Sequence, residues 1–107
     1  MGHQRELFRI ALERTGELRR GHVSAVCEVI DLTEKGIQLK TLLPVEIGDT
    51  LQVAFELTPQ RTIHCTVLVT RVSPPSVGAC ISDISPDDQK HLSHFIEDLI
   101  GLNLGSF

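Results

Sequence analysis

Apolar and polar residues alternate with a period of two over residues 51–57 and again over residues 62–70. The apolar positions are Leu51, Val53, Phe55 and Leu57 in the first segment and Ile63, Cys65, Val67 and Val69 in the second. In a strand with one buried face, every second side chain points to the core, so both segments are predicted to be antiparallel β-strands. The link Thr58-Pro59-Gln60-Arg61 is predicted to be a hairpin connection.

Three further segments favour strands and are separated by turn residues. Residues 22–30 are rich in Val, Ile and Cys, residues 37–40 alternate again, and residues 77–84 follow the break Ser73-Pro74-Pro75-Ser76. Residues 31–36 are predicted to be a polar loop, and Pro44 with Gly48-Asp49 a turn. A weaker pattern over residues 10–17 adds a strand, which makes five or six. Because the links are short, we expect the strands to form a meander.

The C-terminal segment changes to a helical period. Its apolar positions fall on one stripe of a helix: Leu92, Phe95, Ile96, Leu99 and Ile100. Ser85 is predicted to cap this helix, Pro86 to take its first position, and Asp87 and Asp88 to meet the positive end of its dipole. Gly101 is predicted to end it. The expected fold is mainly β, a small barrel or curled sheet with an amphipathic helix over an open end or face.

Length and composition predict one folded domain. The chain has 107 residues, of which 41% are hydrophobic and 22% are charged, with a net charge of −4. Such a chain is too apolar and too evenly charged to be disordered. We expect residues 1–4 to be a flexible N-terminus, residues 5–101 the single domain and residues 102–107 a tail.

Several classes of partner are disfavoured. The acidic balance and the absence of Trp and Tyr argue against binding of long nucleic acids, which needs excess cations and stacking rings. No apolar stretch approaches the roughly 20 residues of a membrane-spanning helix, and no signal peptide is evident, so we expect a cytoplasmic protein without membrane insertion.

Metal, redox and catalytic chemistry are also disfavoured. Cys27, Cys65 and Cys80 lie in apolar runs without Cys-x-x-Cys spacing, and we expect them to be reduced and buried. His91 and His94 could pair on the last helix, but the sequence specifies no third ligand, so a solvated face is the simpler explanation and we expect no metal. No nucleophile, metalloprotease or phosphate-loop motif is present, and we expect no enzyme and no cofactor.

Arginine is concentrated at the start of the chain. Five of the seven arginines are Arg5, Arg9, Arg14, Arg19 and Arg20. Against three glutamates, the first twenty residues carry a local charge of +2, so an anionic ligand has a basic segment to bind. Arg5 and Arg9 are four residues apart and could converge on such a ligand. Considered alone, this pair is better explained as a solvated charged face.

A second motif, Asp31-x-Thr33-x-x-Gly36, occupies the polar loop between two predicted strands. By itself it suggests an Asx-type or Thr-based turn closed by a glycine at positive φ. Together, Arg-x-x-x-Arg, this loop, the strands and the C-terminal helix resemble the PilZ domain family. The resemblance runs from about Arg5 to Ile100 and includes the strand and turn phrases at residues 29–37, 45–51 and 77–85. The family pattern has Ser where this chain has Thr33.

The resemblance implies a six-stranded antiparallel barrel with a C-terminal helix, and a bacterial receptor for cyclic di-GMP. It implies that Arg5 and Arg9 bind phosphate and guanine and become ordered with the ligand, and that Asp31 accepts hydrogen bonds from guanine. The Thr33 hydroxyl is expected to donate to a phosphate or brace the loop. Gly36 is expected to approach the ligand closely or to adopt positive φ. Arg71 is a weaker candidate for stacking on guanine.

A receptor of this kind is expected to signal through a downstream partner protein in the control of motility, biofilm or surface polysaccharide. The alternative is a PilZ-like interaction module that binds protein and no nucleotide. The two arginines and the loop motif favour the receptor.

Overall fold

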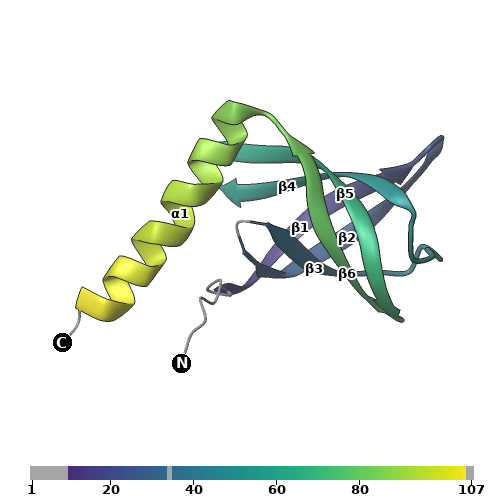
Figure 1. Cartoon of the computed structure of the whole chain (residues 1–107), viewed down its shortest axis with the longest axis horizontal. Helices are drawn as coiled ribbons and strands as arrows, with labels where there is room; N and C mark the ends of the chain where they lie inside the picture. Colours follow the sequence, from purple (N-terminus) through teal and green to yellow (C-terminus); the bar gives the residue numbers. More distant parts are fainter. Residues whose placement is uncertain (1–9, 34, 106–107) are drawn as a thin grey trace, which may run out of the picture.

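The computed structural model describes residues 10–33 and 35–105, and these form six β-strands and one α-helix (Figure 1). The strands are β1 (Ile10–Arg20), β2 (Val23–Leu32), β3 (Gly36–Thr41), β4 (Thr50–Thr58), β5 (Arg61–Ser73) and β6 (Ser76–Ile84), and the helix is α1 (Pro86–Gly105). The predicted strands, the hairpin at residues 58–61 and the C-terminal helix are confirmed. The weakly predicted first strand is a full strand of 11 residues.

The strands close into an antiparallel barrel in the order β1-β2-β3-β6-β5-β4. The predicted meander is correct within each half, β1-β2-β3 and β4-β5-β6. It is wrong between β3 and β4, which are not neighbours: residues 42–49 cross to the other half, and β3 pairs with β6 while β1 pairs with β4. These two pairings join the halves and remove the free edges that an open sheet would expose.

The alternating apolar residues fill the barrel. Leu18, Val29, Leu39, Phe55 and Val67, one from each of the first five strands, are all at most 2% exposed. Gly16 occupies an inward position of β1, which explains why the alternation there is weak in the sequence. A Cβ atom at Gly16 would lie 2.6 Å from the Ala54 carbonyl oxygen and 3.0 Å from the Phe55 Cβ. Only glycine lets β1 approach β4 this closely.

Three glycines therefore provide a graded test of the packing. An added Cβ would lie 2.6 Å from its nearest neighbour at Gly16, 3.2 Å at Gly36 and 3.5 Å at Gly78. We expect Gly16→Ala to lower the free energy of unfolding by about 1–2 kcal/mol, because a backbone carbonyl must move. Gly36→Ala should cost less, and Gly78→Ala, the matched control, should be close to neutral. Urea unfolding checks this order, and a Gly78→Ala variant less stable than Gly16→Ala would contradict it.

Helix α1 starts as predicted and packs its first half on the barrel. The Ser85 hydroxyl accepts a hydrogen bond from the Asp88 amide at 3.1 Å, which confirms the cap. Leu92 and Ile96 are 0% and 3% exposed against the barrel core. The predicted end at Gly101 is wrong, because the helix continues to Gly105. Glycine weakens a helix but keeps its backbone N–H, so it need not end one.

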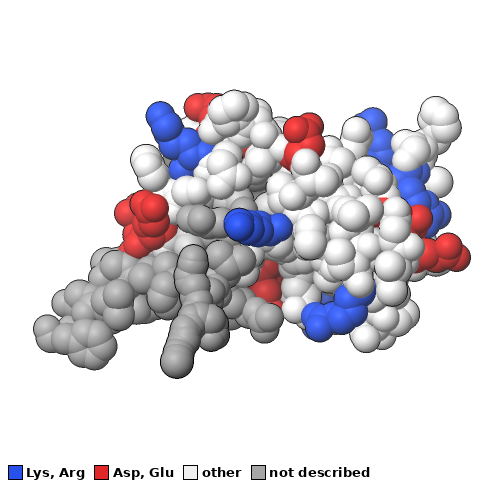
Figure 2. All heavy atoms as spheres, in the orientation of Figure 1, with Lys and Arg blue, Asp and Glu red and all other residues white. Residues whose placement is uncertain are grey.

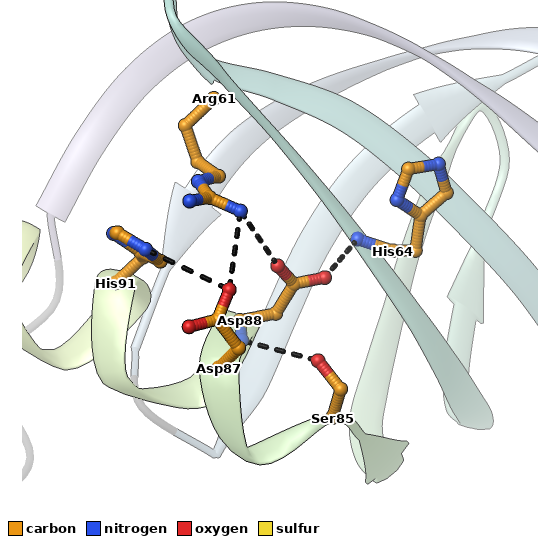
Figure 3. A network of polar contacts seen from close by, with 6 residues as sticks. All are labelled: Arg61, His64, Ser85, Asp87, Asp88 and His91. Atoms are coloured by element: carbon orange, nitrogen blue, oxygen red, sulfur yellow. Dashed lines mark hydrogen bonds and ion pairs between the residues drawn. The ribbon is translucent and has the colours of Figure 1, made fainter.

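A polar network fastens the start of α1 to β5 (Figure 3). The Asp88 carboxylate accepts a hydrogen bond from the His64 amide at 3.1 Å and lies 3.7 Å from the Arg61 guanidinium. β6 pairs with β5 only as far as Cys65, so Asp88 satisfies the amide just beyond the end of that pairing. Asp87 pairs with Arg61 at 3.3 Å and lies 3.8 Å from His91, but it is largely exposed. Asp88 is thus the buried anchor of the helix.

No helix in the described part of the chain has the length and apolarity needed to span a membrane.

The three cysteines have different environments. Cys27 and Cys65 are buried as predicted, and burial raises the pKa of Cys27 to about 11 and the pKa of Cys65 to about 12. Cys80 is exposed, so its predicted burial is wrong. The reason is strand parity: Val77 and Ala79 face the core, and Cys80 therefore faces outward.

We expect one thiol of three to react rapidly with a thiol reagent at pH 8 in the folded protein. Cys80 is accessible, whereas Cys27 and Cys65 are shielded and hold their protons at that pH. Absorbance after addition of Ellman's reagent measures the count, and all three thiols should react in denaturant. Fast reaction of a second thiol in the folded protein would contradict the packing around these side chains.

Candidate functional site

Asp31 reaches the outer face of the barrel because of a bulge in β2. Val29 pairs with Leu39 and Asp31 pairs with Gln38, so Ile30 is the extra residue. The buried residues of β2 are accordingly spaced by two from Cys27 to Val29 and by three from Val29 to Leu32. A bulge re-aims the side chains that follow it. Here it places Asp31 opposite Gln38 at the surface, directly before the loop that carries Thr33.

A second bulge does the same for Arg71 in β5. Val69 pairs with Ala79 and Arg71 pairs with Gly78, which leaves Thr70 as the extra residue. Thr70 and Arg71 are therefore both exposed, although they are consecutive residues. The Thr70 hydroxyl donates a hydrogen bond to the Gly78 carbonyl at 3.3 Å, which holds Thr70 in place. Without this bulge, regular alternation would turn Arg71 toward the core.

The two bulges put both charged residues at the ends of one row across four strands. Asp31 of β2 pairs with Gln38 of β3, Gln38 with Gly78 of β6, and Gly78 with Arg71 of β5. With neighbouring strands about 4.8 Å apart, the row spans the width of a small ligand. A carboxylate and a guanidinium thus flank a floor made by an amide side chain and a glycine.

A pocket of about 240 Å³ lies over this row. Its lining includes four of the six predicted site residues, Asp31, Thr33, Gly36 and Arg71, together with Gln38, Thr70 and Gly78. The three residues of the loop motif and Arg71, which lies 35 or more positions further along the chain, therefore line the same pocket. Polar and charged groups on the rim and a glycine in the floor are suited to a polar ligand that lies flat on the sheet.

Thr33 and Gly36 shape the loop at one end of the pocket. The Thr33 hydroxyl accepts hydrogen bonds from the amides of Lys35 at 3.1 Å and Gly36 at 2.9 Å, and so braces the loop. Gly36 does not have positive φ, and this part of the prediction is wrong. Gly36 begins β3 instead, where an added Cβ would lie 3.2 Å from the Ala79 carbonyl oxygen. The glycine serves close approach of β3 to β6.

Arg71 lies against the surface of Gly78 at the opposite end. A methyl group at Gly78 would be 3.5 Å from both the Cβ and the Nε atoms of Arg71 and 3.7 Å from Nη2. The Arg71 side chain therefore runs past Gly78, where glycine has no side chain to displace it. A guanidinium can stack on an aromatic base and pair with an anion at the same time.

The N-terminal arginines divide into two groups. Arg5 and Arg9 lie outside the described residues. Of the others, Arg14 donates to the Leu57 carbonyl at 3.1 Å, and Arg20 donates to the Pro44 carbonyl and pairs with Asp49 at 3.4 Å. On the face shown in Figure 2, described Lys and Arg side chains are scattered among Asp and Glu and do not form one patch.

A second hollow, of about 430 Å³, lies elsewhere on the barrel. Arg19, Gln52, His64 and Asp83 are among its lining residues, and it shares none with the pocket that contains Asp31.

Residues 10–33 and 35–105 hold no group of three or more potential metal ligands, so His91 and His94 have no third partner there.

Sequence reasoning missed Gln38, Thr70 and Gly78 as site residues. None belongs to a motif, and each becomes part of the site only through strand register. One signal was available: the spacing of the apolar residues that pack in the core changes from two to three, at Val29–Leu32 in β2 and at Val69–Val72 in β5, and this change indicates both bulges. The alignment of the two bulges on one row, however, depends on the pairing of β3 with β6, which closes the barrel.

Comparison with known proteins identifies the fold independently. The family model described as PilZ domain matches residues 3–98. No curated protein sequence matches the chain.

Solved structures with the same fold are distant in sequence. The PilZ domain of YcgR from Escherichia coli, solved with cyclic di-GMP, is 14% identical with a TM-score of 0.75, covering 98% of this chain and 100% of that one. YcgR itself with cyclic di-GMP is 16% identical with a TM-score of 0.79, covering 96% and 49%. The Bacillus subtilis inhibitor of motility MotI is 17% identical with a TM-score of 0.76, covering 92% and 53%.

The chain thus spans about half the length of YcgR and MotI, and the whole of the separate PilZ domain. The family model covers most of the chain, including every strand and the first half of α1, and the barrel topology agrees with it. The chain belongs to the PilZ domain family.

Proposed function

We propose that the chain is a receptor for cyclic di-GMP, and that the pocket over Asp31, Thr33, Gly36 and Arg71 is its binding site. The observation that carries this proposal is that four residues predicted from two separate parts of the sequence line one pocket on the barrel. Two of the similar structures, YcgR and its PilZ domain, were solved with cyclic di-GMP.

The chemistry of the rim supports a guanine ligand. The Asp31 carboxylate can accept hydrogen bonds from the N1–H and N2–H₂ groups of guanine, whereas adenine presents an acceptor at N1. The Arg71 guanidinium can stack on a base or pair with a phosphate. The Thr33 hydroxyl already braces the loop. We therefore assign Thr33 the bracing role of the two that were predicted.

The start of β1 supports a contribution from the N-terminal arginine pair. Ile10 pairs with Leu32, and Ala11 pairs with Asp31. Arg9 is bonded to Ile10, so it directly precedes β1, the strand that pairs with Asp31 through Ala11. We propose that Arg9, with Arg5 four residues earlier, supplies the positive charge that the dianionic ligand requires.

Titration calorimetry of the purified chain with cyclic di-GMP tests the proposal. We expect saturable binding at micromolar ligand and no binding of cyclic di-AMP. An absence of heat at tens of micromolar cyclic di-GMP would overturn the proposal and favour the alternative, a PilZ-like module that binds only protein.

We also propose that the receptor acts in the bacterial cytoplasm through a downstream protein, which affinity capture with and without the nucleotide would identify.

Arg71 is expected to contribute by both charge and stacking. Replacement by Ala should weaken cyclic di-GMP binding about three- to tenfold, since a stacked guanidinium contributes on the order of 1 kcal/mol. Arg71→Lys keeps the charge but loses the plane, and should recover only part of the affinity. The same titration measures both variants. Wild-type affinity in Arg71→Ala would show that Arg71 does not contribute to the binding site.

A further inference from the structure

The polar side chains of the pocket differ in whether they already have hydrogen bonds or contacts within the protein. The Thr33 hydroxyl is held by two loop amides, the Thr70 hydroxyl donates to the Gly78 carbonyl, and Arg71 lies against Gly78. Within residues 10–33 and 35–105, no hydrogen bond engages the side chain of Asp31 or Gln38. Both are half-buried, and both line the pocket. Half-buried polar groups of this kind are open to a ligand.

Asp31 and Gln38 are also direct partners across β2 and β3. Paired strands lie about 4.8 Å apart, which is comparable to the span from N2 to O6 along the edge of guanine. That edge presents two donor groups, N2–H₂ and N1–H, followed by one acceptor, O6. A carboxylate can meet the two donors but repels the acceptor, because it has only acceptor oxygens. The neighbouring amide supplies the missing donor.

We propose that Gln38 is a specificity-determining residue of this pocket, and that its Nε2 group donates a hydrogen bond to O6 of the guanine held by Asp31. This inference rests on the proposed function and deepens it. Asp31 and Gln38 together present acceptor, acceptor and donor, which complements guanine. Adenine presents no hydrogen at N1 and an amino group where guanine has O6, so it mismatches the pair.

The test compares two ligands on three proteins by calorimetry. The ligands are cyclic di-GMP and its analogue with sulfur at position 6 of both guanines, because sulfur is a poor hydrogen-bond acceptor. We expect the wild-type chain to bind cyclic di-GMP about fivefold more tightly than the analogue. Gln38→Leu, similar in size but without the donor, should bind both ligands with about the affinity of the wild type for the analogue.

Gln52→Leu is the matched control, because Gln52 lies on β4 in the second hollow and should keep the wild-type preference. If Gln38→Leu weakens both ligands but keeps the preference, the role of Gln38 is structural and the inference is wrong. Unchanged affinity and preference in Gln38→Leu would also overturn it while leaving the proposed function intact. Absence of binding by the wild-type chain overturns both.

Discussion

Asp31→Ala should weaken cyclic di-GMP binding by between about tenfold and a hundredfold. The carboxylate is proposed to accept two hydrogen bonds from guanine at the open rim of the pocket. We expect their combined net contribution to be roughly 1.5–3 kcal/mol, the value of one hydrogen bond to a charged group. Asp31 lies on the rim of the pocket and holds no described hydrogen bond of its own, so its removal should leave stability nearly unchanged. Calorimetric titration gives the affinity, and urea unfolding confirms that the variant is folded.

Two controls separate recognition from charge. Asp83→Ala removes the same charge from the second hollow and should bind cyclic di-GMP like the wild type. Asp31→Asn keeps the shape but turns one acceptor into a donor that faces guanine donors, so it should lose most of the affinity that Asp31→Ala loses. Wild-type affinity in both Asp31 variants would show that the carboxylate does not contact the ligand.

Asp88→Ala should lower the free energy of unfolding by about 3 kcal/mol, because it leaves the His64 amide without its partner and removes a nearly buried carboxylate from Arg61. The side chain of Asp88 is 12% exposed, so water replaces these contacts poorly. Loss of this anchor should also loosen the packing of Leu92 and Ile96 on the barrel. Urea unfolding measures the loss of stability, and hydrogen exchange over residues 86–96 measures the loosening.

Asp87→Ala is the neighbouring control. Asp87 shares Arg61 with Asp88, but its side chain is 71% exposed, and exposed ion pairs contribute at most about 1 kcal/mol. The two adjacent aspartates should therefore differ clearly in their effect. Equal destabilisation by both variants would mean that charge at the helix start, and not the bond to β5, fastens α1 to the barrel.

The sequence predicted the elements well because each depends on local pattern. Alternation specified the strands around Phe55 and Val67, and Ser85-Pro86 marked the start of α1 at the correct residue. Alternation was weak at β1, where the inward residue Gly16 carries no apolar side chain, so the sequence predicted only residues 10–17 of a strand that runs to Arg20. The prediction failed at the end of α1, because glycine permits a helix to continue.

The site was predictable only in part, because its residues come together through the register between strands. The loop motif and Arg71 were recognisable as residue types, and the structure brings them together at one pocket. Gln38 and Gly78 enter only through the pairing of β3 with β6, which closure of the barrel determines and no local pattern shows. The positive φ predicted as one role of Gly36 was wrong, and the role that the structure shows, close approach to Ala79 on β6, also depends on this pairing.

Mapping of amide chemical shifts during titration with cyclic di-GMP reports both whether the chain binds the nucleotide and where. If the pocket over Asp31 is the binding site, the largest shifts will occur at residues 31–33, 36–38, 70–71 and 78–79, with little change at Arg19, Gln52 and Asp83 in the second hollow. No shifts at saturating ligand, or shifts confined to the second hollow, would show that this pocket is not the binding site.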